Sequence, residues 1–270
     1  MAEISAQAVV FHRAKVGSTE AEWEDCAGYD AGAADRPARY IVVDGATEAY
    51  DSLRWVRQLV TSFLGTDGDA PPALTEAGLD SWFARMQQRW VDEAPRAFAN
   101  IFEERKFQEG SFATFLGCEI HGLGGGSEPV LSVAALGDAV LFHVRGRNVI
   151  EQLPRLAPEE FGINPEGVFT QPSERQRMRT ALQLTTARLQ VGDRLFLATD
   201  ALAQWLAGAS RANPRKCWDA LAEIEHPADF RRFVARARNG RDGLQMKNDD
   251  VTLLRVEITP SDADVLVVCR

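Results

Sequence analysis

Carboxylate side chains stand where predicted strands end. Residues 40–43 form a short apolar, β-branched run, typical of a buried strand, and this run ends on Asp44 and Gly45. A carboxylate at the tip of a buried strand can bind a cation, and the glycine lets the backbone carbonyl approach as a second oxygen ligand. Asp-Gly is also the sequence of an ordinary turn, so this pair alone leaves both interpretations open.

The same arrangement recurs in three other places. A second apolar run, 195–199, is also followed by an aspartate, whereas two acidic pairs stand directly before predicted strands at 26–29 and 251–256. The carboxylates concerned are Asp200, Glu24, Asp25, Asp249 and Asp250. Carboxylates that are distant in sequence but gather at strand ends can form a shared site for a hard cation, and oxygen ligands of this kind suit Mg²⁺ or Mn²⁺.

Six short motifs resemble, in their order, those of the metal-dependent protein phosphatases of the PP2C type. They read Glu-Asp, Val-Val-Asp-Gly, Gly-Ser-x-Ala-Thr, Leu-Gly-Asp, Ala-Thr-Asp and Asp-Asp-x-Thr, and they begin at Glu24, Val42, Gly110, Leu136, Ala198 and Asp249. The match runs from about residue 12 to residue 258. It implies an α+β fold, a four-layer α/β/β/α sandwich in which helices flank two central antiparallel sheets.

The resemblance also implies a centre for two ions of Mg²⁺ or Mn²⁺. Asp44 would act in catalysis by bridging the ions, with the Gly45 carbonyl as a neighbouring ligand. Asp200 and Asp249 would bind one of the ions. Asp249 is preferred to Asp250 because adjacent side chains in an extended segment point in opposite directions.

The remaining acidic motifs would complete this centre. Glu24 and Asp25 would hold the second ion, partly through its waters. Asp138 corresponds to a Gly-Asp motif that supports a looser third ion in some members. Gln204 stands four residues after Asp200, where an aspartate for that ion often lies, and this argues against a third ion.

Two positions depart from the family pattern. Some members carry a histidine after Asp-Gly as the proposed general acid, and this chain has Ala46 there. Many members place a phosphate-binding arginine four residues before the Glu-Asp pair, where this chain has Glu20. A bacterial branch has a lysine before this turn, which makes Lys15 the candidate phosphate-binding residue and Arg13 the second candidate. A solvated Lys15 is the alternative. We expect structural roles for the histidines, which are His12, His121, His143 and His226.

Apolar periodicity predicts the elements around these motifs. Besides the runs above, we expect strands at 4–11, 111–120, 130–136, 139–144 and 182–189. Helices are expected from residue 50 to a C-cap at Gly65, from an N-cap at Asp80 to Pro95, and over 201–206, 212–224 and 228–237. Residues 152–174 contain four prolines and no clear period. The resemblance implies a variable flap there, beside the active site.

Bulk properties narrow the class of protein. A chain of 270 residues with 45% hydrophobic content can bury a full core, and we expect one domain spanning 1–270. The net charge of −9 argues against a nucleic-acid partner. Apolar runs are too short for a membrane span, and the N-terminus does not resemble a signal peptide. The four cysteines have no paired spacing, which indicates free thiols in a reducing compartment, so we expect a cytoplasmic protein; they are Cys26, Cys118, Cys217 and Cys269. We also expect a monomer.

Two functions remain open. The first is a phosphatase that removes phosphate from serine or threonine in a phosphorylated signalling protein, such as a Ser/Thr kinase or one of its targets. The second is a catalytically weak or inactive PP2C-like module that binds a regulatory partner. Retention of Asp44, Asp200 and Asp249 favours the first, because carboxylates that converge without a cation repel one another. The missing arginine and the missing third-ion aspartate favour the second.

Overall fold

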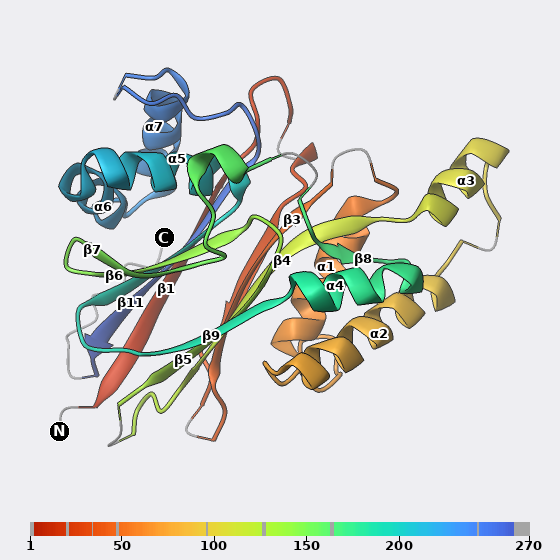
Figure 1. The fold of residues 1–270 in the computed structure, drawn as a ribbon, viewed down its shortest axis with the longest axis horizontal. Helices are drawn as coiled ribbons and strands as arrows, with labels where there is room; N and C mark the ends of the chain where they lie inside the picture. The colour runs from red at the N-terminus through yellow and green to blue at the C-terminus, as the bar shows by residue number, and fades with distance from the viewer. Residues whose placement is uncertain are drawn as a thin grey trace.

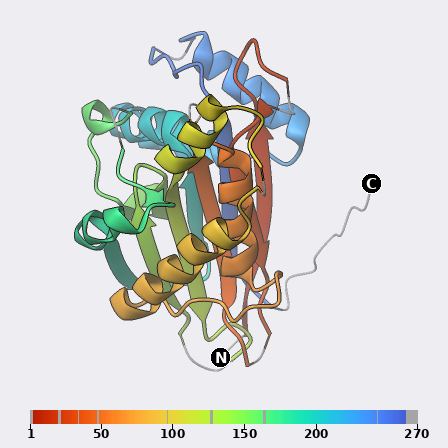
Figure 2. The ribbon, with the colours of Figure 1, turned by 90° about the vertical axis from the view of Figure 1, so that its right-hand side faces the viewer.

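The computed structural model describes residues 3–19, 22–33, 35–46, 49–95, 97–125, 128–162, 165–241 and 243–261. Two antiparallel sheets pack face to face, and helices cover the outer face of each sheet (Figure 1). Turned by 90°, the molecule presents the helices of one outer layer in front of the strands (Figure 2). The four-layer sandwich that the resemblance implied is therefore confirmed.

The first sheet has five strands in the order β1-β11-β10-β6-β7. Their bounds are Ile4–Arg13, Val251–Pro260, Asp193–Ala198, Val140–Arg145 and Asn148–Leu153. β1 ends at Arg13 opposite Val251, where β11 begins, and β10 ends at Ala198 opposite Leu253. The residues that follow β1 and β10 and those that precede β11 therefore meet at one end of this sheet.

The second sheet has six strands, in the order β2-β3-β4-β5-β9 with β8 paired to β4. Their bounds are Cys26–Asp30, Ala38–Gly45, Phe112–His121, Val130–Leu136, Gln183–Arg188 and Val168–Phe169. Cys26 at the start of β2 pairs with Val43, and Asp44 pairs with Thr114 of β4. Since Leu136 at the end of β5 pairs with Phe115, the Leu-Gly-Asp motif lies at the same end.

Seven α-helices form the outer layers of the described part of the chain. They are α1 Ser52–Leu64, α2 Glu76–Asp92, α3 Ile101–Glu109, α4 Arg175–Ala181, α5 Asp200–Ala212, α6 Pro214–Ala222 and α7 Pro227–Arg238. One apolar core lies between the sheets, a second under α1 and α2, and a third under α5, α6 and α7. Burial of these three cores is the main favourable term that holds the layers together.

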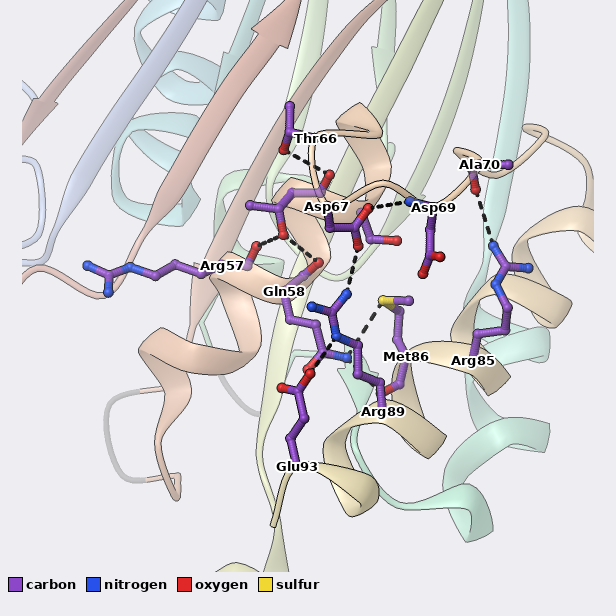
Figure 3. Close-up of polar contacts among 12 residues, drawn as sticks. Arg57, Gln58, Thr66, Asp67, Asp69, Ala70, Arg85, Met86, Arg89 and Glu93 are labelled. Carbon is purple, nitrogen blue, oxygen red and sulfur yellow. Dashed lines mark hydrogen bonds and ion pairs between the residues drawn. The ribbon is translucent and has the colours of Figure 1, made fainter. Parts of the chain in front are cut away.

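The joint between α1 and α2 shows how polar groups fix the helical layer (Figure 3). Gln58 Nε2 donates to the Met86 carbonyl at 2.8 Å, and Arg89 Nη1 donates to Asp67 Oδ2 at 2.7 Å. The large apolar side chains of α2 belong to the core, because each is at most 3% exposed; they are Trp82, Phe83, Met86 and Trp90. The C-cap at Gly65 is also confirmed, with a φ of 70°.

Some local predictions were wrong. α2 begins at Glu76 and is capped by the Thr75 hydroxyl, which accepts from the Gly78 N–H, whereas Asp80 lies inside the helix and pairs with arginines of α4. β7, β8 and α4 were not predicted. The first four residues of β7 are half-buried or exposed, so that strand carries little apolar pattern.

Three of the cysteines, Cys26, Cys118 and Cys217, are free thiols as predicted, and Cys269 lies outside the described residues. Within the described ranges, we find no helix whose length and hydropathy would let it cross a membrane.

Candidate metal centre

Asp25 joins the two sheets at the end where the acidic motifs meet. It precedes β2 of the second sheet, yet its Oδ2 accepts hydrogen bonds from two threonines of the first sheet. Thr252 Oγ1 donates at 2.7 Å and Thr199 Oγ1 at 3.1 Å. The Thr252 N–H also donates to Thr199 Oγ1 at 3.0 Å. Because Thr199 directly precedes Asp200, these bonds hold the start of α5 beside Asp25.

Asp44 lies at the tip of β3 among other carboxylates. Burial raises the pKa of Asp44 well above its usual range, and repulsion from three neighbouring carboxylates raises it further; these are Asp25, Asp200 and Asp138. A hydrogen bond with Asp25 also raises the pKa of Asp44. The structure thus brings together acidic residues from four separate motifs.

The pKa values of the neighbouring carboxyl groups of Asp25 and Asp138 are also raised. Burial, followed by repulsion from Asp250, raises the pKa of Asp25 to about 7, although the two threonine hydrogen bonds oppose the shift. Burial and the charge of Asp200 raise the pKa of Asp138 to about 6. The Gly162 N–H donates to Asp138 Oδ2 at 3.3 Å and partly offsets that shift. Burial is thus the largest cause of the raised pKa in both groups, and a neighbouring carboxylate adds to it.

The two adjacent aspartates before β11 have different surroundings. Asp250 is bound to backbone, since its carboxylate accepts from the Lys15 N–H at 2.8 Å and the Glu24 N–H at 3.1 Å. Asp249 lies close enough to Asp200 for repulsion, second to burial, to raise its pKa. Asp249 therefore interacts with Asp200, whereas Asp250 interacts with Asp25, so the two adjacent side chains face different carboxylates of the cluster.

Glu24 and Gly45 lie beside each other at the edge of the cluster. Glu24 Oε1 accepts a hydrogen bond from Ser52 Oγ of α1 at 2.8 Å. A Cβ at residue 45 would lie 2.8 Å from the Glu24 carbonyl oxygen and 3.0 Å from Val56 Cγ1. The close approach of these two backbones therefore requires glycine at position 45.

Lys15 and the 152–174 segment lie next to the acidic groups. Lys15 follows β1, and its positive charge lowers the pKa of Asp249. Burial of Asp249 has the larger, opposite effect. Gln204 Nε2 of α5 donates to the Pro158 carbonyl at 2.7 Å and so fixes the short helical turn Pro158–Glu160. Gln204, which stands where other members often have an aspartate for a third ion, therefore has a structural contact with Pro158.

Sequence reasoning missed Lys247 and gave no role to Thr199 or Thr252. Lys247 Nζ lies 3.0 Å from Asp200 Oδ2. Its only sequence signal is its position two residues before Asp249. The two threonines belong to the Ala-Thr-Asp and Asp-Asp-x-Thr motifs, and that membership was the signal available for them.

The donor set fits a hard divalent cation in chemistry. It consists of carboxylate oxygens, among which Asp44 and Asp138 have raised pKa values, and the hydroxyl of Thr114, opposite Asp44 on β4, is buried without a hydrogen-bond partner. In the described conformation no three His, Cys, Asp or Glu side chains are arranged to hold one ion among the residues the structure covers. Lys247 pairs with Asp200, and the Gly162 N–H donates to Asp138. An ion that binds these two carboxylates would have to displace both contacts.

Comparison with known proteins identifies the fold. No family model and no curated protein sequence matches the chain. The catalytic domain of the serine/threonine protein phosphatase PstP, solved with two manganese ions, matches with a TM-score of 0.62 at 16% identity, covering 95% of this chain and 99% of that one. Stp1 of Staphylococcus aureus matches with a TM-score of 0.62 at 15% identity, over 93% and 94%.

A third solved structure, the photosystem II phosphatase PBCP, matches with a TM-score of 0.59 at 12% identity, covering 94% of this chain and 98% of that one. At such identities the likeness concerns the arrangement of elements. The chain therefore has the fold of the PP2C-type serine/threonine phosphatases.

Proposed function

We propose that this protein is a phosphatase that uses Mg²⁺ or Mn²⁺ to hydrolyse phosphoserine and phosphothreonine in proteins. The observation that carries the proposal is the convergence of Asp25, Asp44, Asp138 and Asp200 at one end of the two sheets, where burial and neighbouring carboxylates raise the pKa values of the first three. Two solved phosphatases of the same fold are described with serine/threonine specificity, and one of them holds two manganese ions.

The chain's own residues divide the work. Asp44 would hold both ions, and this is supported by the carboxylates from both sheets that act on it. Thr199 and Thr252 hold Asp25 in position through the bonds described above. Divalent ions bound there would lower the pKa of water and offset charge on the phosphate. Lys15 is proposed to bind the substrate phosphate as a point charge.

The proposed setting follows from this chemistry. Substrates would be phosphorylated proteins of the cytoplasm, such as a Ser/Thr kinase or one of its targets, and the protein would act as a monomer with a single domain. The acidic chain, with its net charge of −9, would bind neither nucleic acid nor anionic membranes.

The function is tested by phosphate release from a phosphoserine peptide and from para-nitrophenyl phosphate. We expect turnover in Mn²⁺, none after removal of metal by EDTA, and recovery when Mn²⁺ is restored, because the carboxylates alone cannot activate water. A folded protein that releases no phosphate from either substrate in Mn²⁺ would favour the partner-binding module instead.

Replacement of Lys15 tests its proposed contact with phosphate. Lys15→Ala should raise KM for the phosphopeptide severalfold and leave Mn²⁺ affinity nearly unchanged, because the side chain would act on the substrate only. The backbone N–H of residue 15, which holds Asp250, survives the substitution. Lys106→Ala, on the exposed face of α3, is the matched control. Equal KM values in the Lys15 variant and the wild type would show that Lys15 is a solvated surface residue that does not bind the substrate phosphate.

A further inference from the structure

One lysine occupies the side of Asp200 on which the acidic cluster lies. Lys247 Nζ lies 3.0 Å from Asp200 Oδ2, and the Asp200 residue is only 9% exposed. Asp138 and Asp249 also lie within electrostatic reach of this lysine. The ammonium therefore interacts with three acidic residues of the proposed centre.

The backbone of Gly162, in the 152–174 segment, also lies close to the ammonium of Lys247, whose side chain is 36% exposed. A Cβ at residue 162 would collide with Lys247 Nζ and would lie 3.9 Å from Asp200 Oδ2. The Gly162 N–H meanwhile donates to Asp138 Oδ2. Gly162 has a φ of 83°, a region that favours glycine, so its backbone closes over the lysine without a side chain. Lys247 is thus held between Asp200 and this backbone.

We propose that Lys247 is the internal counter-ion of the carboxylate cluster and competes with a divalent ion for Asp200. An ammonium and a dication that share the Asp200 carboxylate repel each other, so a binding ion would displace the lysine from Oδ2. Lys247 would thereby stabilise the metal-free protein and raise the metal concentration at which the centre fills. The inference rests on the proposed function only in taking Asp200 as a metal ligand.

The competition is tested by calorimetric titration of Mn²⁺ into the wild type and Lys247→Gln. The variant keeps a long polar side chain but loses the charge, so it should bind Mn²⁺ on the order of tenfold more tightly. Its melting temperature in EDTA should fall below that of the wild type, because the carboxylates lose their counter-ion. Lys106→Gln, exposed on α3, makes the same change in net charge and should alter neither quantity.

A second measurement uses the wild type alone and does not depend on the folding of any variant. Acetic anhydride should label Lys247 several times faster with saturating Mn²⁺ than in EDTA, relative to Lys106, because the ion displaces the amine from Asp200. Mass spectrometry reads the two sites in one sample. Unchanged labelling of Lys247 would overturn the proposal.

The outcomes separate this proposal from the proposed function. Tighter Mn²⁺ binding by Lys247→Gln without phosphatase activity in either protein would support the competition and refute the phosphatase. Equal Mn²⁺ affinity in the two proteins, or no Mn²⁺ binding by either of them, would overturn the competition. An equal gain in Lys106→Gln would also overturn it, since the effect would then come from net charge alone.

Discussion

The Asp44→Asn variant should fold, should lose at least one of two Mn²⁺ ions and should hydrolyse para-nitrophenyl phosphate on the order of a thousandfold more slowly than the wild type. Asp44 lies at the tip of β3 among three other carboxylates, where it is proposed to touch both ions. The substitution removes the negative charge they would share. The remaining amide oxygen is a weaker ligand and cannot offset the repulsion between two dications.

Folding should survive this change because Asp44 is buried among other carboxylates, where a neutral side chain is favoured. Burial and three neighbouring carboxylates raise the pKa of Asp44, which means that its ionised form is unfavourable in the folded protein. The asparagine relieves that cost. Urea unfolding in EDTA should therefore show the variant to be at least as stable as the wild type.

A matched control distinguishes the loss of a ligand shared by two ions from the loss of one negative charge elsewhere in the protein. Asp35→Asn changes an exposed aspartate that precedes the other end of β3, and it should bind Mn²⁺ and turn over substrate as the wild type does. Calorimetry and the para-nitrophenyl phosphate assay are run on all three proteins. A folded Asp44→Asn protein with near wild-type turnover would contradict the two-ion mechanism.

The Asp193→Ala variant should lose about 3 kcal/mol of stability or more, because it breaks a buried ion-pair network. Asp193 opens β10 and is fully buried. Its carboxylate accepts from Arg145 Nε at 2.7 Å, from His143 Nε2 at 2.8 Å and from the Gln190 N–H at 2.9 Å. Alanine would leave the buried His143 without this partner. The structural role predicted for His143 is confirmed by this contact.

The acid dependence of this network has a definite sign. Burial raises the pKa of Asp193, but the hydrogen bonds from Arg145, Gln190 and His143 together lower it by more. The pKa of Asp193 in the folded protein therefore lies below the ordinary value. The stability that the carboxylate contributes is therefore complete above about pH 4 and is lost as the pH falls through the lowered folded pKa. The difference in stability between the wild type and Asp193→Ala should shrink in that acid range.

Urea unfolding at neutral pH measures the loss, and Asp219→Ala provides the control. Asp219 pairs with Arg147 at 2.9 Å, but both side chains are more than a third exposed, at 38% and 48%. Breaking such a surface pair should cost less than about 1 kcal/mol. A loss at Asp193 no larger than the loss at Asp219 would show that the buried network does not anchor β10.

The layers of this fold were predictable because its central strands are long and apolar. The apolar runs at 40–43 and 195–199 end within two residues of the ends of β3 and β10. These runs were enough to place Asp44 and Asp200 at strand ends. β8 could not be predicted in the same way, since it has only two residues and exists through its pairing with β4. The start of α2 was misplaced because two residues, Thr75 and Asp80, could each cap a helix.

The contacts within the site were less predictable than the acidic residues themselves. Lys247 meets Asp200 across 47 positions of sequence, and no local period records such an ion pair. Thr199 and Thr252 reach Asp25 across 174 and 227 positions. These partners depend on which strand ends coincide, and that is decided by the register of β10 against β11 and by the packing of the two sheets.

The most direct test of the account is to locate Mn²⁺ by anomalous diffraction from crystals grown with the ion. We predict two manganese peaks about 4 Å apart, both within about 2.5 Å of carboxylate oxygens of Asp44, with Lys247 displaced from Asp200. Crystals in which saturating Mn²⁺ leaves Asp44 without a manganese peak would contradict the proposed centre.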